Sequence, residues 1–256
     1  MRTVLGALSI ALLVGCGGGG GGTGGGACDA LKIAGGESCS GQGNVALVLG
    51  NNPREGKIEN CTGAYVSLTS VLTAAHCFPG VTEVVVASKG NLRKGVRVFI
   101  HPLYNGSVGS PFDMAIVRVD QPLEGAGPVP ILLSRSPAQG ESVVVYGYGL
   151  DESGNLALDR IQSGEEPLKA TVTTYVGFEQ GTDVVVSTGA GSTCGGDSGG
   201  PFLAKDDRGQ YGIFGITRAG PAGCGAPEGR PSALSSTQTN GAINFLTSVV
   251  PDLAVN

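Results

Sequence analysis

The segment from Cys194 to Pro201 reads CGGDSGGP and places one serine, Ser198, among four glycines. A serine hydroxyl is a poor nucleophile at neutral pH. Acyl transfer therefore needs a neighbouring base and N–H donors aimed at the carbonyl oxygen that becomes negative. Glycines allow the tight backbone turn that presents such donors. The segment predicts a nucleophilic serine in a loop built for acyl chemistry.

Two further residues are candidates for the base and for the acid that orients it. His76 in TAAHC is the expected base, and Asp113 in FDMAIV is the carboxylate expected to hold its imidazole. The chain has only one other histidine, His101, which precedes a proline and is expected to be structural. Because two histidines without CxxC or HxxxH spacing offer few metal ligands, we expect no metal site and no cofactor.

Short apolar runs from about Val45 onward must position these side chains. They alternate with clusters of Gly, Pro, Asn, Asp and Ser, a pattern typical of an all-β sandwich or barrel without an evident internal repeat. One late segment differs, because Ile243, Leu246 and Val250 recur at helical spacing behind Asn240, the expected cap of a single C-terminal helix. The runs that we expect to form strands include Val45–Leu49, Tyr65–Leu68, Glu83–Ala87, Val96–Ile100, Met114–Val119, Ser142–Tyr146, Ala170–Tyr175, Asp183–Ser187 and Tyr211–Ile216.

Length and charge limit the classes of protein that fit. The chain has 256 residues, 41% of them hydrophobic, which is enough apolar material for one large core or two small ones. Its formal net charge is −5, the wrong sign for binding a phosphate backbone. We therefore expect no nucleic-acid partner.

The first residues predict export. Arg2 followed by the apolar stretch Val4–Val14 is typical of a secretory signal at 1–15, and about a dozen apolar residues are too few for a membrane-spanning helix. The signal ends in LVGC, which resembles the lipobox of bacterial lipoproteins, so Cys16 is expected to carry a lipid. The alternative is ordinary secretion with an unmodified Cys16. Residues 16–32, rich in glycine, are expected to be a tether and propeptide that holds the protein at the outer membrane or cell surface.

The order His76, Asp113, Ser198 resembles that of the trypsin/chymotrypsin family of serine endopeptidases. The resemblance extends from about Ile33 to Val250 and includes the motifs IAGG at Ile33, HPLY at His101 and GYG at Gly147. It implies a protease domain over 33–256, made of two six-stranded antiparallel Greek-key β-barrels with a C-terminal helix.

The same resemblance implies how the residues act. Ser198 would attack a peptide carbonyl, His76 would take and return the proton, and Asp113 would fix the imidazole tautomer. The N–H groups of Gly196 and Ser198 would form the oxyanion hole. The expected substrates are proteins or peptides.

Six cysteines remain besides Cys16, and an even number in an exported chain favours three disulfides, although spacing alone leaves 15 pairings open. The resemblance implies two of them. They are Cys61–Cys77 and Cys194–Cys224. Cys28 and Cys39 are then left as the third pair, and whether they form a bond stays open.

In this family a new amino terminus pairs with the aspartate before the catalytic serine. Here the resemblance predicts cleavage between Lys32 and Ile33 and a pair between Ile33 and Asp197, so the protein is expected to be a zymogen. If Cys28 and Cys39 are bridged, the cut enzyme stays attached to its lipid.

The resemblance places three residues in the substrate pocket: Ser192 at its floor, Gly220 at its wall, and Ser232. None is charged, so we expect uncharged, medium or large apolar side chains at the cleaved position. Cleavage after Lys32 then requires another protease. Arg218 and Ala219 depart from the family, which has Ser-Trp there.

Two other functions are open. A non-catalytic member of the family could serve as a surface binding module. A serine esterase would carry a G-x-S-x-G elbow with Ser-Asp-His order, which this chain lacks.

Overall fold

The structure is a computed structural model, and it describes residues 44–125, 127–151, 153–162, 168–179, 182–187, 192–221, 224 and 231–256. The expected signal peptide at 1–15 and the tether and propeptide at 16–32 lie outside the described residues. The same is true of Cys16, Cys28, Lys32, Ile33 and Cys39. The predictions made for them therefore stay predictions.

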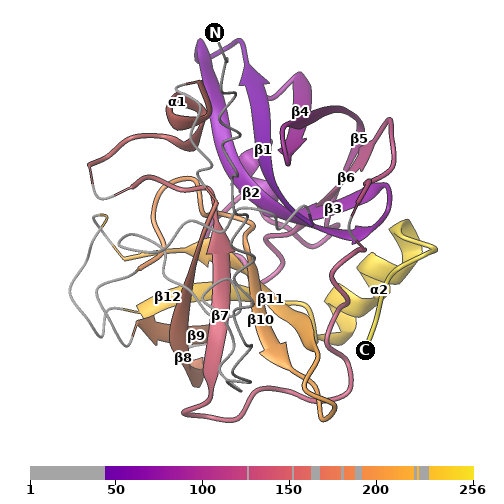
Figure 1. Cartoon of the computed structure of the whole chain (residues 1–256), viewed down its shortest axis with the longest axis vertical. Helices are drawn as coiled ribbons and strands as arrows, with labels where there is room; N and C mark the ends of the chain where they lie inside the picture. Colours follow the sequence, from indigo (N-terminus) through magenta and orange to yellow (C-terminus); the bar gives the residue numbers. More distant parts are fainter. Residues whose placement is uncertain are drawn as a thin grey trace, which may run out of the picture.

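The first six strands close into an antiparallel barrel, drawn in indigo to magenta in the upper part of Figure 1. Its interior is apolar because alternate residues of the strands point inward, and Tyr65, Val71 and Val117 are completely buried there. In their order around the barrel the strands are β1 (Val45–Asn52), β2 (Lys57–Ser67), β3 (Ser70–Thr73), β6 (Ala115–Val119), β5 (Asn91–Ile100) and β4 (Glu83–Ser88).

The next six strands close into a second barrel beneath the first. Phe202, Phe214 and Val143 pack in its interior. In their order around the barrel the strands are β7 (Ser142–Gly147), β8 (Lys169–Glu179), β9 (Thr182–Ser187), β12 (Pro231–Ser236), β11 (Tyr211–Ala219) and β10 (Pro201–Lys205). Both barrels thus have the same strand order, although the sequence shows no repeat, and the prediction of a trypsin-like, two-barrel fold is confirmed.

The helices correct two details of the prediction. The C-terminal helix exists as α2 (Asn240–Val249), but its cap is Thr239, whose extended backbone lets its hydroxyl accept a hydrogen bond from the N–H of Ala242. It is not the only α-helix among the described residues, since α1 (Ala157–Gln162) precedes β8. Six residues are too few to show an apolar period in a sequence. A 3₁₀ turn, η2 (Ala75–Cys77), follows β3.

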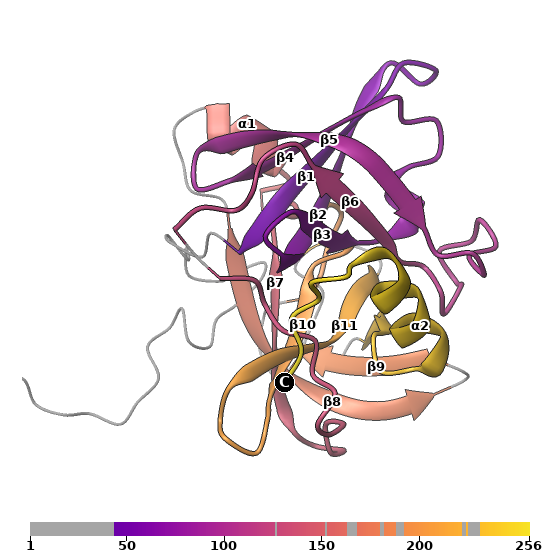
Figure 2. The same ribbon diagram turned by 90° about the vertical axis from the view of Figure 1, so that its right-hand side faces the viewer.

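A third apolar cluster lies between the barrels and joins them. Ile116 and Met114 contribute from the first barrel, Ile213 and Ile216 from the second, and Leu246 from α2. All five are completely buried or nearly so. Figure 2 shows α2 beside the junction of the two barrels. The barrels are therefore held in one relative position by shared packing rather than by a linker alone.

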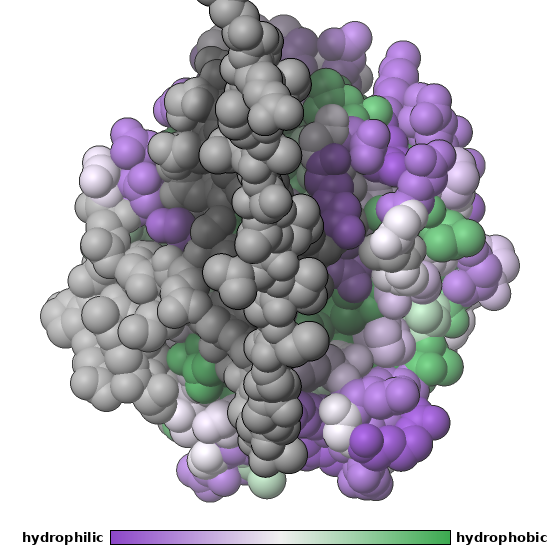
Figure 3. Space-filling view, viewed as in Figure 1, coloured by the Kyte–Doolittle hydropathy of each residue, from purple (hydrophilic) through white to green (hydrophobic). Residues whose placement is uncertain are grey.

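The surface carries separate apolar side chains. Leu92 and Leu103 are the most exposed large hydrophobic residues, and on the face in Figure 3 green residues lie among purple ones. Within the described part of the chain, every helix is too short or too polar to span a bilayer.

Candidate active site

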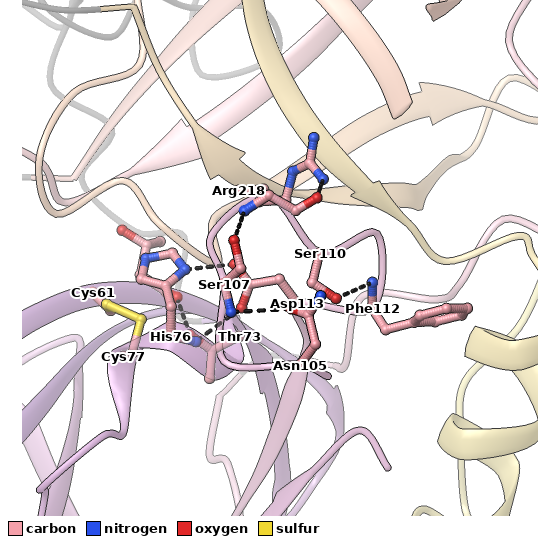
Figure 4. A network of polar contacts seen from close by, with 12 residues as sticks. Cys61, Thr73, His76, Cys77, Asn105, Ser107, Ser110, Phe112, Asp113 and Arg218 are labelled. Atoms are coloured by element: carbon pink, nitrogen blue, oxygen red, sulfur yellow. Dashed lines mark hydrogen bonds and ion pairs between the residues drawn. A yellow bond between two sulfur atoms is a disulfide. The ribbon is translucent and has the colours of Figure 1, made fainter. Parts of the chain in front are cut away.

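His76 and Asp113 form a bonded pair at the edge of the first barrel, as shown in Figure 4. The Nδ1 atom of His76 lies 2.6 Å from Oδ2 of Asp113, and the backbone N–H of His76 donates to Oδ1 at 2.8 Å. Asp113 is completely buried, whereas the His76 side chain is 19% exposed. The carboxylate thus binds the imidazole at Nδ1, while Nε2 lies on the opposite edge of the ring.

Local structure on both sides holds this pair. His76 lies in η2. The residue after it, Cys77, forms a disulfide with Cys61 of β2. Asp113 lies two residues before the start of β6, and its N–H donates to the carbonyl of Ser110 in a turn. The disulfide predicted by the family resemblance is confirmed, and so is Cys194–Cys224.

The loop that carries Ser198 needs its glycines. Gly196 and Gly199 have φ angles of +93° and +83°, in the region that side chains rarely adopt. A Cβ atom at Gly199 would also collide with Thr73 and with the backbone of Thr62. The loop therefore packs directly against the first barrel, and only glycine fits there.

This close packing brings Ser198 to the side of the first barrel where His76 lies. The carbonyl of Ser198 accepts a hydrogen bond of 2.8 Å from the N–H of Thr62. Thr62 follows Cys61, whose disulfide partner Cys77 is adjacent to His76. Ser198 thus lies against the strand that is joined by the Cys61–Cys77 disulfide to the residue next to His76.

In the loop that carries Ser198, the carbonyl groups are hydrogen-bonded, whereas two of the N–H groups are not bonded to any described residue. The carbonyl groups of residues 194 to 198 all accept hydrogen bonds: the donors are the N–H groups of Asp197, Leu150, Gly200 and Thr62 and the hydroxyl of Thr62. In contrast, the N–H groups of Gly196 and Ser198 donate to no acceptor in the described part of the chain. Two backbone donors are therefore available to an oxygen atom of another molecule.

Comparison with known proteins agrees with this geometry. The family model described as Trypsin matches residues 33–240. The chain belongs to the trypsin family of serine proteases. At the level of the family it is a serine-type peptidase. The two-barrel fold, the order of the three residues along the chain and the two disulfides agree with that membership.

Three relatives illustrate the range of the family. The chain is 27% identical over 225 residues to "Trypsin" of Saccharopolyspora erythraea, covering 79% of this chain and 92% of that protein. It is 30% identical over 248 residues to "Kallikrein-2" of Homo sapiens, covering 86% of this chain and 89% of the relative. "Ovochymase" of Halocynthia roretzi is much longer: the match, 24% identical over 183 residues, covers 62% of this chain but 12% of that protein.

The residues expected at the substrate pocket lie together in the second barrel. Ser192 and Ser232 are buried and line one small cavity with Thr193. The hydroxyls of Thr193 and Ser232 are 2.8 Å apart, and that of Ser192 has no hydrogen-bond partner among the described residues. Gly220 lies against Thr193, where a Cβ atom would collide with the Thr193 backbone. The described floor is thus neutral and carries hydroxyl groups.

Asp197 is completely buried. Its Oδ1 atom accepts a hydrogen bond of 2.8 Å from the N–H of Gly149, and its Oδ2 atom accepts one of 2.7 Å from the N–H of Cys194. The carboxylate therefore joins the start of the serine loop to the segment that follows β7. Ile33, its expected partner after cleavage, lies outside the described residues.

Arg218 shows how the chain accommodates its departure from the family. The residue lies in β11, is 7% exposed, and donates from Nη1 to the carbonyl of Gly109 at 2.7 Å. Gly109 belongs to the loop that leads to Asp113, so Arg218 joins the second barrel to that loop (Figure 4). Burial lowers the pKa of Arg218, while the charge of Asp113 acts in the opposite direction. The sequence shows the replacement but not this contact.

The remaining histidine is confirmed as a packed residue. His101 is buried between Phe112 and Phe245, with ring centroids 4.8 and 4.9 Å away. Cys61, His76 and Cys77 form the one group of potential metal ligands that the described residues contain. Both thiols are used in the disulfide, so this group offers a metal only the imidazole.

Proposed function

We propose that the protein is an endopeptidase in which Ser198, His76 and Asp113 act as a catalytic triad. The observation that supports this proposal most strongly is the hydrogen bond from the His76 ring to the buried carboxylate. With its proton on Nδ1, shared with Asp113, the imidazole keeps a lone pair on Nε2 for the proton of Ser198. The histidine is thereby held in the tautomer that can act as a base.

The reaction follows from this arrangement. The oxygen of Ser198 forms a bond to the scissile carbonyl carbon as its proton moves to His76, and the carbonyl oxygen becomes negative. The N–H groups of Gly196 and Ser198, which lack acceptors in the described structure, stabilise that oxygen. His76 then returns the proton to the leaving amine, which leaves an acyl ester on Ser198. Water, deprotonated by the same imidazole, hydrolyses the ester.

We propose further that cleavage after Lys32 activates the enzyme and that Cys16 anchors it to a membrane. The support is the IAGG motif at Ile33 and the position of Cys16 directly after the apolar segment. Replacing Cys16 by serine should move the protein from the membrane fraction to the soluble fraction. Equal membrane recovery of both forms would contradict the lipid anchor.

For substrates, the hydroxyl-lined, uncharged floor at Ser192 supports neutral side chains at the cleaved position. A peptide-library cleavage profile tests this preference. Strong selectivity for arginine or lysine would contradict it and would remove the need for a separate activating protease.

Covalent labelling with a fluorescent fluorophosphonate tests the triad. The full chain, cut after Lys32, should be labelled rapidly, whereas the Ser198→Ala variant and the uncut chain should not react. Ser67→Ala, which removes a buried hydroxyl that accepts from the N–H of Thr69 in the turn between β2 and β3, is the matched control and should be labelled as the parent is. Absence of labelling in the cut parent would favour the non-catalytic binding module instead.

A further inference from the structure

Thr62 of β2 contacts the serine loop through its side chain and its backbone N–H. It is completely buried. Its N–H donates to the carbonyl of Ser198, and its hydroxyl donates to the carbonyl of Gly196, both at 2.8 Å. The same hydroxyl accepts a hydrogen bond of 2.8 Å from the N–H of Tyr148. One first-barrel residue thus binds the loop and the neighbouring segment of the second barrel.

These bonds complete the restraint of four consecutive peptide planes. The planes that begin at Gly195 and Asp197 carry the N–H groups of Gly196 and Ser198, and they are held by donors in the second barrel, Leu150 and Gly200. The carbonyl groups of the planes that begin at Gly196 and Ser198 are held by Thr62. The Gly196–Asp197 plane, which lies between the two free N–H groups, is thus held at its carbonyl by the Thr62 hydroxyl and at its other end by the Asp197 N–H, which donates to the carbonyl of Cys194.

We infer that the Thr62 hydroxyl is a positioning group that keeps the N–H groups of Gly196 and Ser198 aimed at a single point. A peptide plane shares a rotatable bond with the plane on each side. Loss of the Thr62 hydrogen bond frees the carbonyl end of the Gly196–Asp197 plane, and its rotation turns both N–H groups away from the developing negative charge. This inference rests on the proposed function, because it concerns the donors that would stabilise the reaction's oxyanion.

The chemistry of the hydroxyl explains why threonine or serine is needed. A hydroxyl can donate one hydrogen bond and accept others, so Thr62 satisfies both the Gly196 carbonyl and the Tyr148 N–H. Valine has the same shape but can do neither, and it would remove one hydrogen bond from each of these two backbone groups. Serine keeps the hydroxyl and loses only a methyl group.

The test compares Thr62→Val and Thr62→Ser in the full chain, each cut after Lys32 in the same way as the parent. The limiting rate and the half-saturating concentration of labelling by a fluorescent fluorophosphonate are measured separately. We expect Thr62→Val to lower the limiting rate about 10- to 100-fold with little change in the half-saturating concentration. Thr62→Ser should stay within about threefold of the parent, since its hydroxyl can restore the restraint.

A control separates positioning from general loss of stability. Thr237 is also completely buried, and its hydroxyl donates to the carbonyl of Ile213 within the second barrel at 3.0 Å. Thr237→Val should lower the melting temperature but leave the labelling rate unchanged. If Thr62→Val does not fold, Thr62→Ala is compared with Thr62→Ser, because that pair differs only in the hydroxyl.

The outcomes are distinguishable. A slow valine or alanine variant, rescued by serine, supports the inference. A parent that is labelled at Ser198 together with a hydroxyl-free variant that reacts equally fast overturns the inference alone. A cut parent that is not labelled at all overturns the proposed function and the inference together.

Discussion

The roles of single residues at this site depend on which atoms their hydrogen bonds occupy. Asp113 accepts two hydrogen bonds from one residue, the backbone N–H and the ring Nδ1 of His76. The first sets where the histidine lies, and the second sets which ring nitrogen keeps the proton. A neutral, isosteric side chain at position 113 separates these two effects.

Asp113→Asn is expected to lower kcat about 10⁴-fold, as in the general template for this triad. The amide can present an N–H group to Nδ1, which shifts the ring proton to Nε2 and removes the base. The measurement is steady-state peptide hydrolysis at neutral pH by the enzyme cut after Lys32. A loss of less than about tenfold would show that the carboxylate does not control the tautomer.

Arg218→Gln is expected to lower kcat/KM for peptide hydrolysis on the order of tenfold. The arginine donates to the carbonyl of Gly109, in the loop that ends at Asp113, so its loss lets that loop and the carboxylate shift. Arg218→Lys keeps a cationic donor and should show a smaller loss. An unchanged kcat/KM in the glutamine variant would refute this positioning role.

At the scale of elements, the loop between β5 and β6 is held against α2 by one neutral histidine. His101 accepts a hydrogen bond from the N–H of Leu103 at Nδ1, and its Nε2 faces the carbonyl of Gly241 at 3.2 Å. Burial lowers the pKa of His101 below its ordinary value of 6.5, with the Gly241 carbonyl acting in the opposite direction. The loop that ends at Asp113 is thus attached to the helix by a group that resists protonation.

This attachment predicts a pH dependence of stability. Because the folded-state pKa of His101 is depressed, the unfolded chain binds a proton first as the pH falls below about 6.5. The free energy of unfolding should therefore decrease as the pH falls through this range. His101→Gln, which keeps an N–H donor without titrating there, should show a shallower decrease. Denaturant titrations at pH 7 and pH 5 measure the difference, and parallel losses in both proteins would exclude His101 as a cause.

At the scale of the whole molecule, the apolar cluster between the barrels couples their stabilities. Its members come from β6, β11 and α2, so neither barrel can unfold without exposing side chains of the other. The proposed catalytic groups are divided in the same way, with His76 and Asp113 on the first barrel and Ser198 on the second. The packing that stabilises the fold therefore also keeps the candidate site assembled.

Ile116→Ala is expected to reduce the free energy of unfolding by about 2–5 kcal/mol, and the matched Ile116→Val by about 0.5–1.5 kcal/mol. The side chain is completely buried in the shared cluster. Both barrels should lose stability together, which amide exchange followed by mass spectrometry can resolve barrel by barrel. Destabilisation confined to the first barrel would contradict the coupling.

The sequence by itself determined the residues with the most specific local context. The glycines around Ser198, the motif around His76 and the apolar run after Asp113 each lie within a few positions, and the family resemblance derived from them predicted the two barrels and two disulfides correctly. The chemistry of such a segment is encoded in its own residues, so it can be predicted without knowing what packs against it. The helix cap at Thr239 and the short helix α1 were missed because they depend on local backbone geometry and context.

Only the tertiary structure decided the contacts that cross between the barrels. The Thr62 hydroxyl and the Gly196 carbonyl are 134 positions apart, and Arg218 and Gly109 are 109 positions apart. No periodicity or motif connects such residues. Their contacts exist because each chain half closes into a barrel and the two then pack in one register, which sets the direction of individual backbone groups.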